Sequence, residues 1–452
     1  MRKLYPFLLL IGIFTWVVPA SAQMRETGLS FSVQSKVIDT VSPTQAGAPT
    51  KNTSVGYKTV TLFPELISIK DKQTETIYDF KNQQLISLSP ATRTYFITSL
   101  YAVPAFKAME KANRAMIGGA LGKAGITQMG NVEPFDLDMM FGGPFKSEDA
   151  KGVSSTKDAT GGKYKFRGED IAGYTVTRTP IPDALKKSYA RYIAYEFTLH
   201  PLIQKELSER ALFATLRFTN HGMIPAVSEK TFGTSLARET TEPPPSIPTG
   251  YKLAQPGKEA AISVLLAAPP KVTAQDSLAL IKKLHADKKY TDVAVAFMGH
   301  TYAYGTDGVE QLKPVLGNLM KEAPPTSGVR EIFGICSAQP SAQGAAQKVT
   351  FLKQVQAGNP VLGYMIGGCL ALYQDAAGKP ADAQATRLAA LARNPAMVAV
   401  MKDLGDGYYR QYDPFMAWAF WNKARAINPG HPILSGLGSL EEKLARDYPD
   451  YF

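Results

Sequence analysis

The 452-residue sequence predicts an α+β protein of two domains, an antiparallel β-rich part followed by an all-helical part. Short apolar and β-branched runs separated by turn residues extend from Ser30 to about Ala268, a texture typical of strands. From Ala274 onward, apolar residues recur at helical spacing instead. Near the C-terminus several residues recur with a period of 34, which is the length of one helix-turn-helix unit.

The first 22 residues have the composition of an export signal. Arg2 and Lys3 precede an apolar run, and Ala-Ser-Ala at residues 20–22 supplies the small side chains before a cleavage site. We therefore expect residues 1–22 to be removed and the protein to lie in the bacterial periplasm, with secretion as the alternative. No later segment reaches 18 uninterrupted apolar residues, so we expect no transmembrane segment in the mature chain.

Residues 23–268 predict an antiparallel meander with one helix. Lys81-Asn82 and Ser89-Pro90 are suited to tight turns between its early strands. Over residues 101–121 the apolar period becomes helical, and after a long loop the strand texture resumes. The expected strands cover residues 57–69, 74–80, 84–88, 92–100, 163–166, 173–178, 192–200, 212–218 and 261–266.

Residues 269–452 predict a run of paired helices. Pro269 and Pro270 break regular structure between the two parts. Thr273 and Asp276 have the spacing of a capping box for a helix that begins at residue 274.

The period of 34 residues links two segments, residues 364–397 and residues 398–431. In the second copy, Gly405 and Ala417 are small where two helices of a hairpin approach closely. Asp413 is suited to cap the second helix of this copy, with Pro414 at its first position. The residues that recur are Leu370, Ala383, Ala390 and Pro395, as Leu404, Ala417, Ala424 and Pro429.

The second copy resembles a tetratricopeptide repeat. Met401 departs from the family pattern, which usually has tryptophan there, and the first copy has Gln374 and Arg387 where aromatic residues belong. The resemblance covers under a fifth of the chain. It implies a scaffold of stacked helical pairs that binds a protein or a peptide. The matching positions are Leu404, Gly405, Tyr408, Ala417, Trp421, Ala424 and Pro429.

The β-rich part resembles the periplasmic lipoprotein-carrier (LolA-like) fold. The resemblance rests on Ile-Tyr-Asp-Phe at residues 77–80 and on Gly-Glu-Asp-Ile-Ala-Gly-Tyr at residues 168–174. In that fold a curved antiparallel sheet wraps around a helix. The resemblance therefore implies an apolar pocket on the concave side of the sheet, and the alternative function of carrying a lipid or another apolar ligand.

No catalytic or cofactor-binding pattern stands out, so we expect a binding protein without enzyme activity, cofactor or metal. The five histidines stand singly, and neither a nucleophile elbow nor a dinucleotide fingerprint is present. A further alternative is a cell-envelope hydrolase that uses Asp136 or Asp138 on the long loop. The net charge, +11 with the signal and +9 without Arg2 and Lys3, is scattered along the chain, so we expect no nucleic-acid partner.

Two further sets of residues are candidates for specific roles. Tyr409, Arg410 and Tyr412 lie outside the repeat signature and are the candidates for an exposed surface that contacts a partner. Cys336 and Cys369 are the only cysteines, and their separation of 33 residues places them on corresponding parts of adjacent helices. The sequence leaves open whether they pair or are buried thiols; a disulfide would contribute roughly 3 to 4 kcal/mol.

Overall fold

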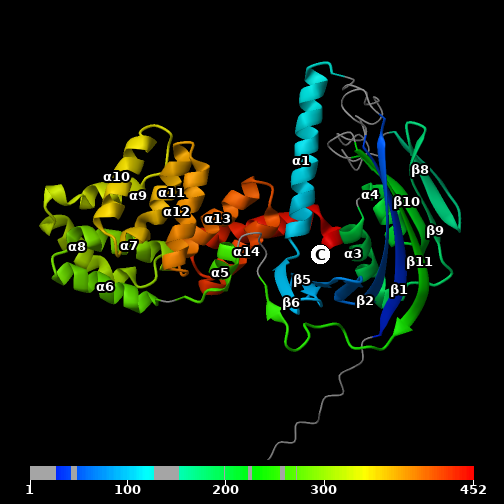
Figure 1. Ribbon diagram of the computed structural model, residues 1–452, viewed down its shortest axis with the longest axis horizontal. Coiled ribbons are helices and arrows are strands. Elements are labelled where there is room, and N and C mark those ends of the chain that lie inside the picture. The colour runs from blue at the N-terminus through cyan, green and yellow to red at the C-terminus, as the bar shows by residue number, and fades with distance from the viewer. Residues whose placement is uncertain are drawn as a thin grey trace, which may run out of the picture.

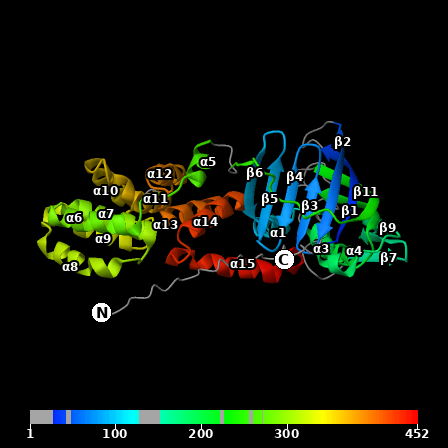
Figure 2. The same ribbon diagram turned by 90° about the horizontal axis from the view of Figure 1, so that it is seen from below.

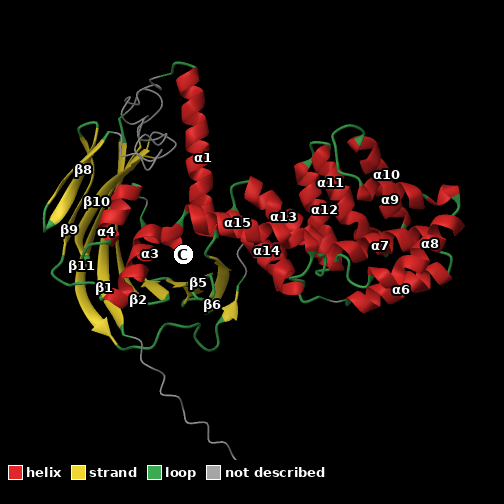
Figure 3. Cartoon of the chain, turned by 180° about the vertical axis from the view of Figure 1, so that it is seen from behind, coloured by secondary structure: helices red, strands yellow, loops and turns green. Residues whose placement is uncertain are grey.

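The computed structural model describes residues 27–41, 48–126, 152–197, 199–221, 226–254, 260–270 and 272–452. Figure 1 shows a curved sheet from the first half of the chain beside an array of helices from the second half, and Figure 3 separates the same two halves by element type. The predicted α+β class is therefore confirmed. The export signal expected at residues 1–22 lies outside the described residues.

The strands of the described residues form a single sheet. They are β1 (Gly28–Val41), β2 (Thr50–Phe63), β3 (Leu66–Lys70), β4 (Glu75–Asp79), β5 (Gln84–Ser89), β6 (Thr94–Ser99), β7 (Val153–Lys157), β8 (Gly161–Phe166), β9 (Glu169–Val176), β10 (Phe213–His221), β11 (Ala226–Thr240) and β12 (Lys252–Leu253). Their order is β12-β6-β5-β4-β3-β2-β1-β11-β10-β9-β8-β7, antiparallel except between β12 and β6. Strands β1 to β6 therefore follow one another from the middle of the sheet toward one edge. Strands β7 to β11 follow one another from the opposite edge back to β1.

The turns of the meander follow from local residues. After β4, the backbone N–H of Asn82 donates to the Asp79 carboxylate at 3.0 Å, and Gln83 takes a positive φ of 54°. The single strand expected over residues 57–69 is wrong, because a turn at Pro64 divides the run into β2 and β3. Proline has no N–H to donate to a ladder and favours a turn, which explains the division.

Two expected strands are helices. Residues 192–200 were expected as a strand because they are aromatic and branched, but α3 (Lys186–Glu196) covers most of them. Tyr189, Tyr192 and Ile193 of α3 are all buried, and a helix buried on nearly every side shows no amphipathic period. Residues 261–266 form α5 (Ala260–Ala267) instead of a closing strand, since a short apolar run does not distinguish a strand from a buried helix.

Side chains fill the inner face of the sheet. Helices α3 and α4 (Pro201–Ser208) lie against this face in Figure 1, and Tyr192 packs edge-on against Phe31 of β1 with ring centroids 5.7 Å apart. Tyr189 and Ile193 are fully buried in the same cluster. The concave side that the lipoprotein-carrier resemblance assigned to an apolar ligand is therefore occupied by the chain itself along α3.

The C-terminal segment also joins this core. In Figure 2, α15 (Ser435–Asp447) runs from the helical array toward the sheet and brings the C-terminus beside α3. Tyr451 packs against Tyr195 of α3 with ring centroids 4.9 Å apart, and the Tyr195 hydroxyl donates to the Tyr451 carbonyl at 3.3 Å. The side chain of Arg191 donates to the main-chain oxygen of Phe452 at 3.3 Å. The end of the helical half thus packs into the sheet half.

Two helices begin where the caps in the sequence predict. Thr273 and Asp276 form the predicted capping box, and Asp413 caps a helix whose first residue is Pro414. The helix expected over residues 101–121 is α1, which stands away from the sheet in Figure 1. Helix α1 spans Ala102–Lys123. The other α-helices not yet named are α6 (Ala274–Ala286), α7 (Tyr290–Tyr304), α8 (Lys313–Glu322), α9 (Val329–Ser337), α10 (Ala345–Gly358), α11 (Gly367–Ala376), α12 (Pro380–Arg393), α13 (Val398–Arg410) and α14 (Pro414–Ile427). The 3₁₀ helices are η1 (Asp183–Leu185), η2 (Val309–Leu312), η3 (Pro325–Ser327), η4 (Gly363–Ile366), η5 (Pro432–Leu434) and η6 (Pro449–Tyr451).

Helical hairpins make up the second half. Helix α6 pairs with α7, α11 with α12, and α13 with α14, and α12 packs against α13. Ile262, Leu265 and Leu266 of α5 are buried in the same cluster as the helices of the last two hairpins. Helix α5 thus contacts the helical half, and the boundary expected at residue 268 stays a prediction.

Candidate functional site

The two copies of the repeat are two successive hairpins. The first consists of α11 and α12 and the second of α13 and α14, and they stack through α12 and α13. The recurring positions that the sequence identified as packing residues are buried in both copies. They are Leu370, Ala383 and Ala390 in the first and Leu404, Ala417 and Ala424 in the second.

The second hairpin packs closely around an aromatic core. A Cβ added to Gly405 would lie 3.0 Å from the Ala417 carbonyl oxygen and would overlap the indole of Trp421. The Trp421 indole N–H in turn lies 3.2 Å from both the Lys402 carbonyl oxygen and the Asp406 carboxylate. Only glycine therefore allows this approach of α13 to α14.

The first hairpin has polar side chains at the corresponding aromatic positions. Gln374 and Arg387 replace the aromatic pair, and both are nearly fully buried, at 3% and 4% exposed. The Arg387 guanidinium donates to the Asp375 carboxylate of α11 at 2.6 Å, while its Nε finds no partner among the described residues. The repeat thus places a buried cation where its second copy has an aromatic ring.

A cavity of about 620 Å³ lies where the two hairpins meet, and we call it the inter-hairpin cavity. Residues of α11, α12 and α13 line it, and most of them are polar or charged. Its volume falls in the range of about 300 to 1,000 Å³ that is typical of pockets for small ligands. The lining residues are Leu372, Asp375, Pro380, Gln384, Arg387, Asp403, Leu404, Asp406, Gly407, Tyr408, Arg410 and Gln411.

One face of α13 forms a wall of this cavity. Asp403, Gly407 and Arg410 follow one another at helical spacing, so they share that face. A Cβ added to Gly407 would meet nothing within 4 Å, which leaves open space between the two charged residues. The side chains of Asp403 and Arg410 make no hydrogen bond and no ion pair within 4 Å with any residue that the structure describes.

The surroundings of Asp403 disfavour its charge. Loss of water around the carboxyl raises its pKa to about 6, although Arg387 acts in the opposite direction. Asp406 and Asp375 raise the pKa further by repulsion, and Lys402 lowers it. The cavity therefore holds a carboxylate that ionises near neutral pH without a partner of its own.

The three residues expected to form a contact surface have different environments. Arg410 is exposed and lines the inter-hairpin cavity. Tyr409 is only half exposed, because its ring packs against Trp418 and Trp421 at centroid distances of 6.0 and 5.5 Å. Tyr412 is 52% exposed at a positive φ of 63° and is not among the lining residues. Only Arg410 of the three thus combines exposure with a place in the cavity.

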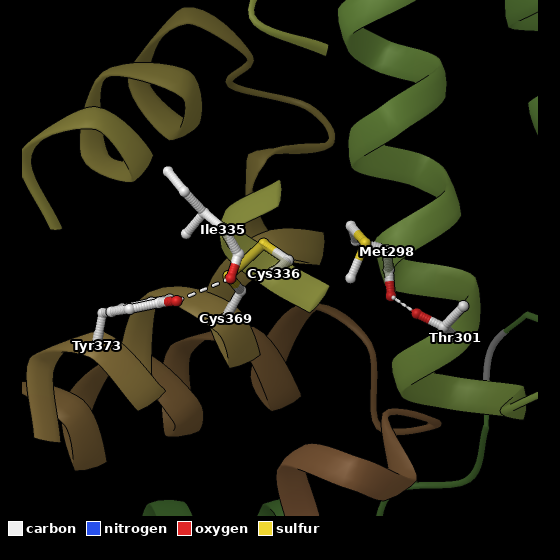
Figure 4. The surroundings of a disulfide bond; sticks show 6 residues. All are labelled: Met298, Thr301, Ile335, Cys336, Cys369 and Tyr373. Atoms are coloured by element: carbon white, nitrogen blue, oxygen red, sulfur yellow. Dashed lines mark hydrogen bonds between the residues drawn. A yellow bond between two sulfur atoms is a disulfide. The ribbon is translucent and has the colours of Figure 1, made fainter. Parts of the chain in front are cut away.

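The two cysteines form a disulfide that joins α9 to α11. Cys336 and Cys369 have Cα atoms 5.5 Å apart, and Figure 4 shows the bond between the two helices. Beside it, the Tyr373 hydroxyl donates to the Ile335 carbonyl oxygen at 2.9 Å, which ties the same two helices together. This linkage fixes α11, the helix that carries Asp375, on the preceding part of the array.

Sequence reasoning missed the charged centre of the cavity. Asp375, Arg387 and Asp403 come from three helices, and no local spacing brings them together. A signal was nevertheless present, since Arg387 occupies a position where the repeat expects an aromatic residue. A charged residue at a position that is expected to lie in the core indicates either a buried ion pair or a binding site.

Other candidate sites carry less chemistry. A second cavity of about 300 Å³ lies beside η4, but the hydroxyl of Tyr304 there already donates to the Val272 carbonyl at 2.5 Å. Asp136 and Asp138, the residues of the hydrolase alternative, lie outside the described residues. Within the described residues, no three acidic, histidine or cysteine side chains gather to hold a metal, and no helix has both the length and the apolar character to cross a bilayer.

Comparisons with known proteins find similarity among solved structures alone. No protein-family model matches the chain, and no curated protein matches it. Among solved structures, the chain is similar to one described as showing lipid-protein interactions in lipovitellin, with 10% sequence identity and a TM-score of 0.16. The alignment covers 89% of this chain and 53% of the lipovitellin chain, so this chain spans about half the length of that structure. A likeness at this TM-score assigns neither a fold nor a function.

Proposed function

We propose that this chain is an exported, non-enzymatic binding protein that holds a peptide or a protein segment in the inter-hairpin cavity. The resemblance of the second hairpin to a tetratricopeptide repeat supports a scaffold role, and the export signal expected at residues 1–22 supports the periplasm, with secretion as the alternative. The sheet, which resembles the lipoprotein-carrier fold, serves as the body against which the helical array is fixed.

The observation that carries this proposal is the open polar wall of α13. The side chains of Asp403 and Arg410 have no hydrogen-bond or ion-pair partner within the described part of the chain, and they lie on either side of Gly407 in a cavity of about 620 Å³. Charged side chains inside a purely structural interface are normally paired, because an unpaired charge that loses water destabilises the fold. A polar ligand supplies the partner that Asp403 lacks, and on the same wall it also meets Arg410, which is exposed to solvent.

A steric variant tests the proposal. Gly407→Leu places a side chain in the cavity without a clash in the protein, since nothing lies within 4 Å of the added Cβ. The matched control is Gly438→Leu on α15, which also has open space around it but lies outside the cavity. Both changes replace a helical glycine, so both should leave the helix intact or stabilise it.

Selection from a phage-displayed library of random peptides gives the readout. We expect peptides that bind the wild-type chain and Gly438→Leu but lose at least tenfold in affinity for Gly407→Leu, a difference of about 1.4 kcal/mol. Failure to select any peptide, or binders that tolerate Gly407→Leu as well as the control, would contradict a ligand site in this cavity.

An apolar ligand bound at the sheet is the alternative function, but the inner face of the sheet, as far as the structure describes it, has no open space along α3. Tyr189, Tyr192 and Ile193 occupy the inner face there with 2% exposure or less. Organic extraction of the purified chain followed by native mass spectrometry decides this alternative, because a stoichiometric lipid would require these side chains to move.

A further inference from the structure

We propose that the inter-hairpin cavity selects a peptide by a lysine or arginine side chain, which pairs with Asp403, and by an acidic side chain, which pairs with Arg410. This inference rests on the proposed function and specifies its ligand. The same peptide would place its backbone over Gly407, where α13 has no side chain in the way.

The pairing of the other charges leaves these two residues available. Asp375 is bound by Arg387 at 2.6 Å, and Asp406 is bound by Lys402 at 2.5 Å. Of the charged residues that line the cavity, Asp403 and Arg410 therefore remain without a partner among the described residues. One carboxylate and one guanidinium match a ligand that carries one charge of each sign.

The positions on the helix set the spacing of the ligand charges. Asp403 and Arg410 are seven residues apart on α13, which corresponds to about 10 Å along the helix axis at 1.5 Å per residue. A peptide in the polyproline II conformation advances about 3.1 Å per residue and returns to the same face every three residues, so a cation and an acid three positions apart lie about 9 Å apart on the face toward α13. The direction of the peptide is open, and both Lys-x-x-Glu and Glu-x-x-Lys satisfy the distance.

An ammonium or guanidinium group suits Asp403 better than a divalent metal. Such metals are bound by several oxygen ligands, whereas Asp375 and Asp406 are already engaged by cations. A single organic cation needs one carboxylate and forms charge-assisted hydrogen bonds with it. The ligand cation also removes the free-energy cost of an ionised Asp403 that has lost water.

The groups that face Asp403 define how pH affects binding. They are Tyr302 on α7, Asp375 on α11, Arg387 on α12, and Lys402 and Asp406 on α13. Because loss of water raises the pKa of Asp403 to about 6, this carboxyl loses its negative charge between pH 7.5 and pH 5.0. Affinity for the cationic peptide should therefore fall about tenfold over this range.

Fluorescence anisotropy with defined peptides tests the selection. The probe is a labelled Gly-Ser-Ala peptide with one lysine and one glutamate three residues apart, in both orders. Matched peptides replace the lysine with norleucine or the glutamate with glutamine. The protein variants are Asp403→Asn, Arg410→Gln and Gly407→Leu, with Gly438→Leu as the control.

The expected result is a pair of specific couplings. Norleucine for lysine should weaken binding to the wild-type chain about tenfold but have less than about a twofold effect on Asp403→Asn, and the same should hold for the glutamate with Arg410→Gln. Equal losses in wild type and variant, or no binding of either probe order, would overturn the inference. If library peptides still bind in a manner sensitive to Gly407→Leu, the proposed function stands and only this charge selection fails.

Discussion

Replacing Asp403 with asparagine should stabilise the helical half at neutral pH, although it should abolish selection of a cationic peptide. Asparagine keeps the size and shape of the side chain and one acceptor oxygen, while it replaces the other oxygen with an NH2 donor and removes the charge. In the folded chain the pKa of Asp403 is raised from 3.8 to about 6, mainly because the carboxyl loses water. The ionised form is thus less favourable in the folded chain than in the unfolded one.

The shift sets the size of the effect. A difference of about two pKa units corresponds to roughly 3 kcal/mol, at about 1.4 kcal/mol per unit. The destabilisation is nearly absent below pH 3.8, develops between pH 3.8 and about 6, and is complete above the folded pKa of about 6. Asp403→Asn should therefore raise the free energy of unfolding by about 3 kcal/mol at pH 8 and by less than about 1 kcal/mol at pH 4.

Thermal denaturation followed by circular dichroism at both pH values measures this difference. A gain of about 3 kcal/mol corresponds to an increase of roughly 6 to 12 °C in the melting temperature of a domain of this size. The control is Glu442→Gln, an exposed residue of α15, which should change the free energy of unfolding by less than about 0.5 kcal/mol at either pH. A destabilised Asp403→Asn at pH 8, or a gain independent of pH, would refute the reasoning.

Three further sets of substitutions test which contacts stabilise the helical half and its contact with the sheet. Replacing Cys336 and Cys369 with serine should lower the free energy of unfolding by roughly 3 to 4 kcal/mol in urea titrations. An unchanged urea midpoint would mean that the disulfide does not stabilise the fold by restricting the unfolded chain. Gly405→Ala should lower the free energy of unfolding by about 1 to 3 kcal/mol, because the added Cβ overlaps side-chain and main-chain atoms of α14. Gly407→Ala, whose added Cβ meets nothing within 4 Å, should be neutral or slightly stabilising. Equal melting temperatures of the two variants would contradict this contrast. Tyr451→Ala should cost about 3 kcal/mol and increase hydrogen exchange in α3; exchange that stays unchanged there would show that the C-terminal segment rests on the sheet without stabilising it.

Local signals allowed much of the fold to be predicted. The capping box of Thr273 and Asp276, and the Asp413-Pro414 pair, fixed helix starts because their chemistry involves only neighbouring residues. The turn after β4 was predictable for the same reason. By contrast, α3 was expected as a strand, because Tyr192 and its neighbours are buried on nearly all sides and carry no helical period.

The candidate site was predictable only in part. Arg410 was expected at a contact surface and does line the inter-hairpin cavity, because residues near the end of a repeat helix are commonly exposed. Asp403 gave no signal, since a single aspartate in a helix is normally solvated. Its environment depends on Asp375 and Arg387, which belong to other helices, so the pKa shift is a property of the packing between hairpins.

The departure of the first repeat from its aromatic pattern offers the clearest connection between sequence and site. Where the second hairpin fills its interior with Trp421, the first has Arg387, whose ion pair with Asp375 takes up less of the space between the hairpins. Arg387 lines the cavity at this position, and the side chain of the neighbouring Asp403 has no hydrogen-bond or ion-pair partner among the described residues. A fold selected for stability alone would place an apolar ring at Arg387 and a neutral residue at Asp403. Both residues place a charge at the same cavity, which is the pattern expected where binding, and not stability, determines the side chains.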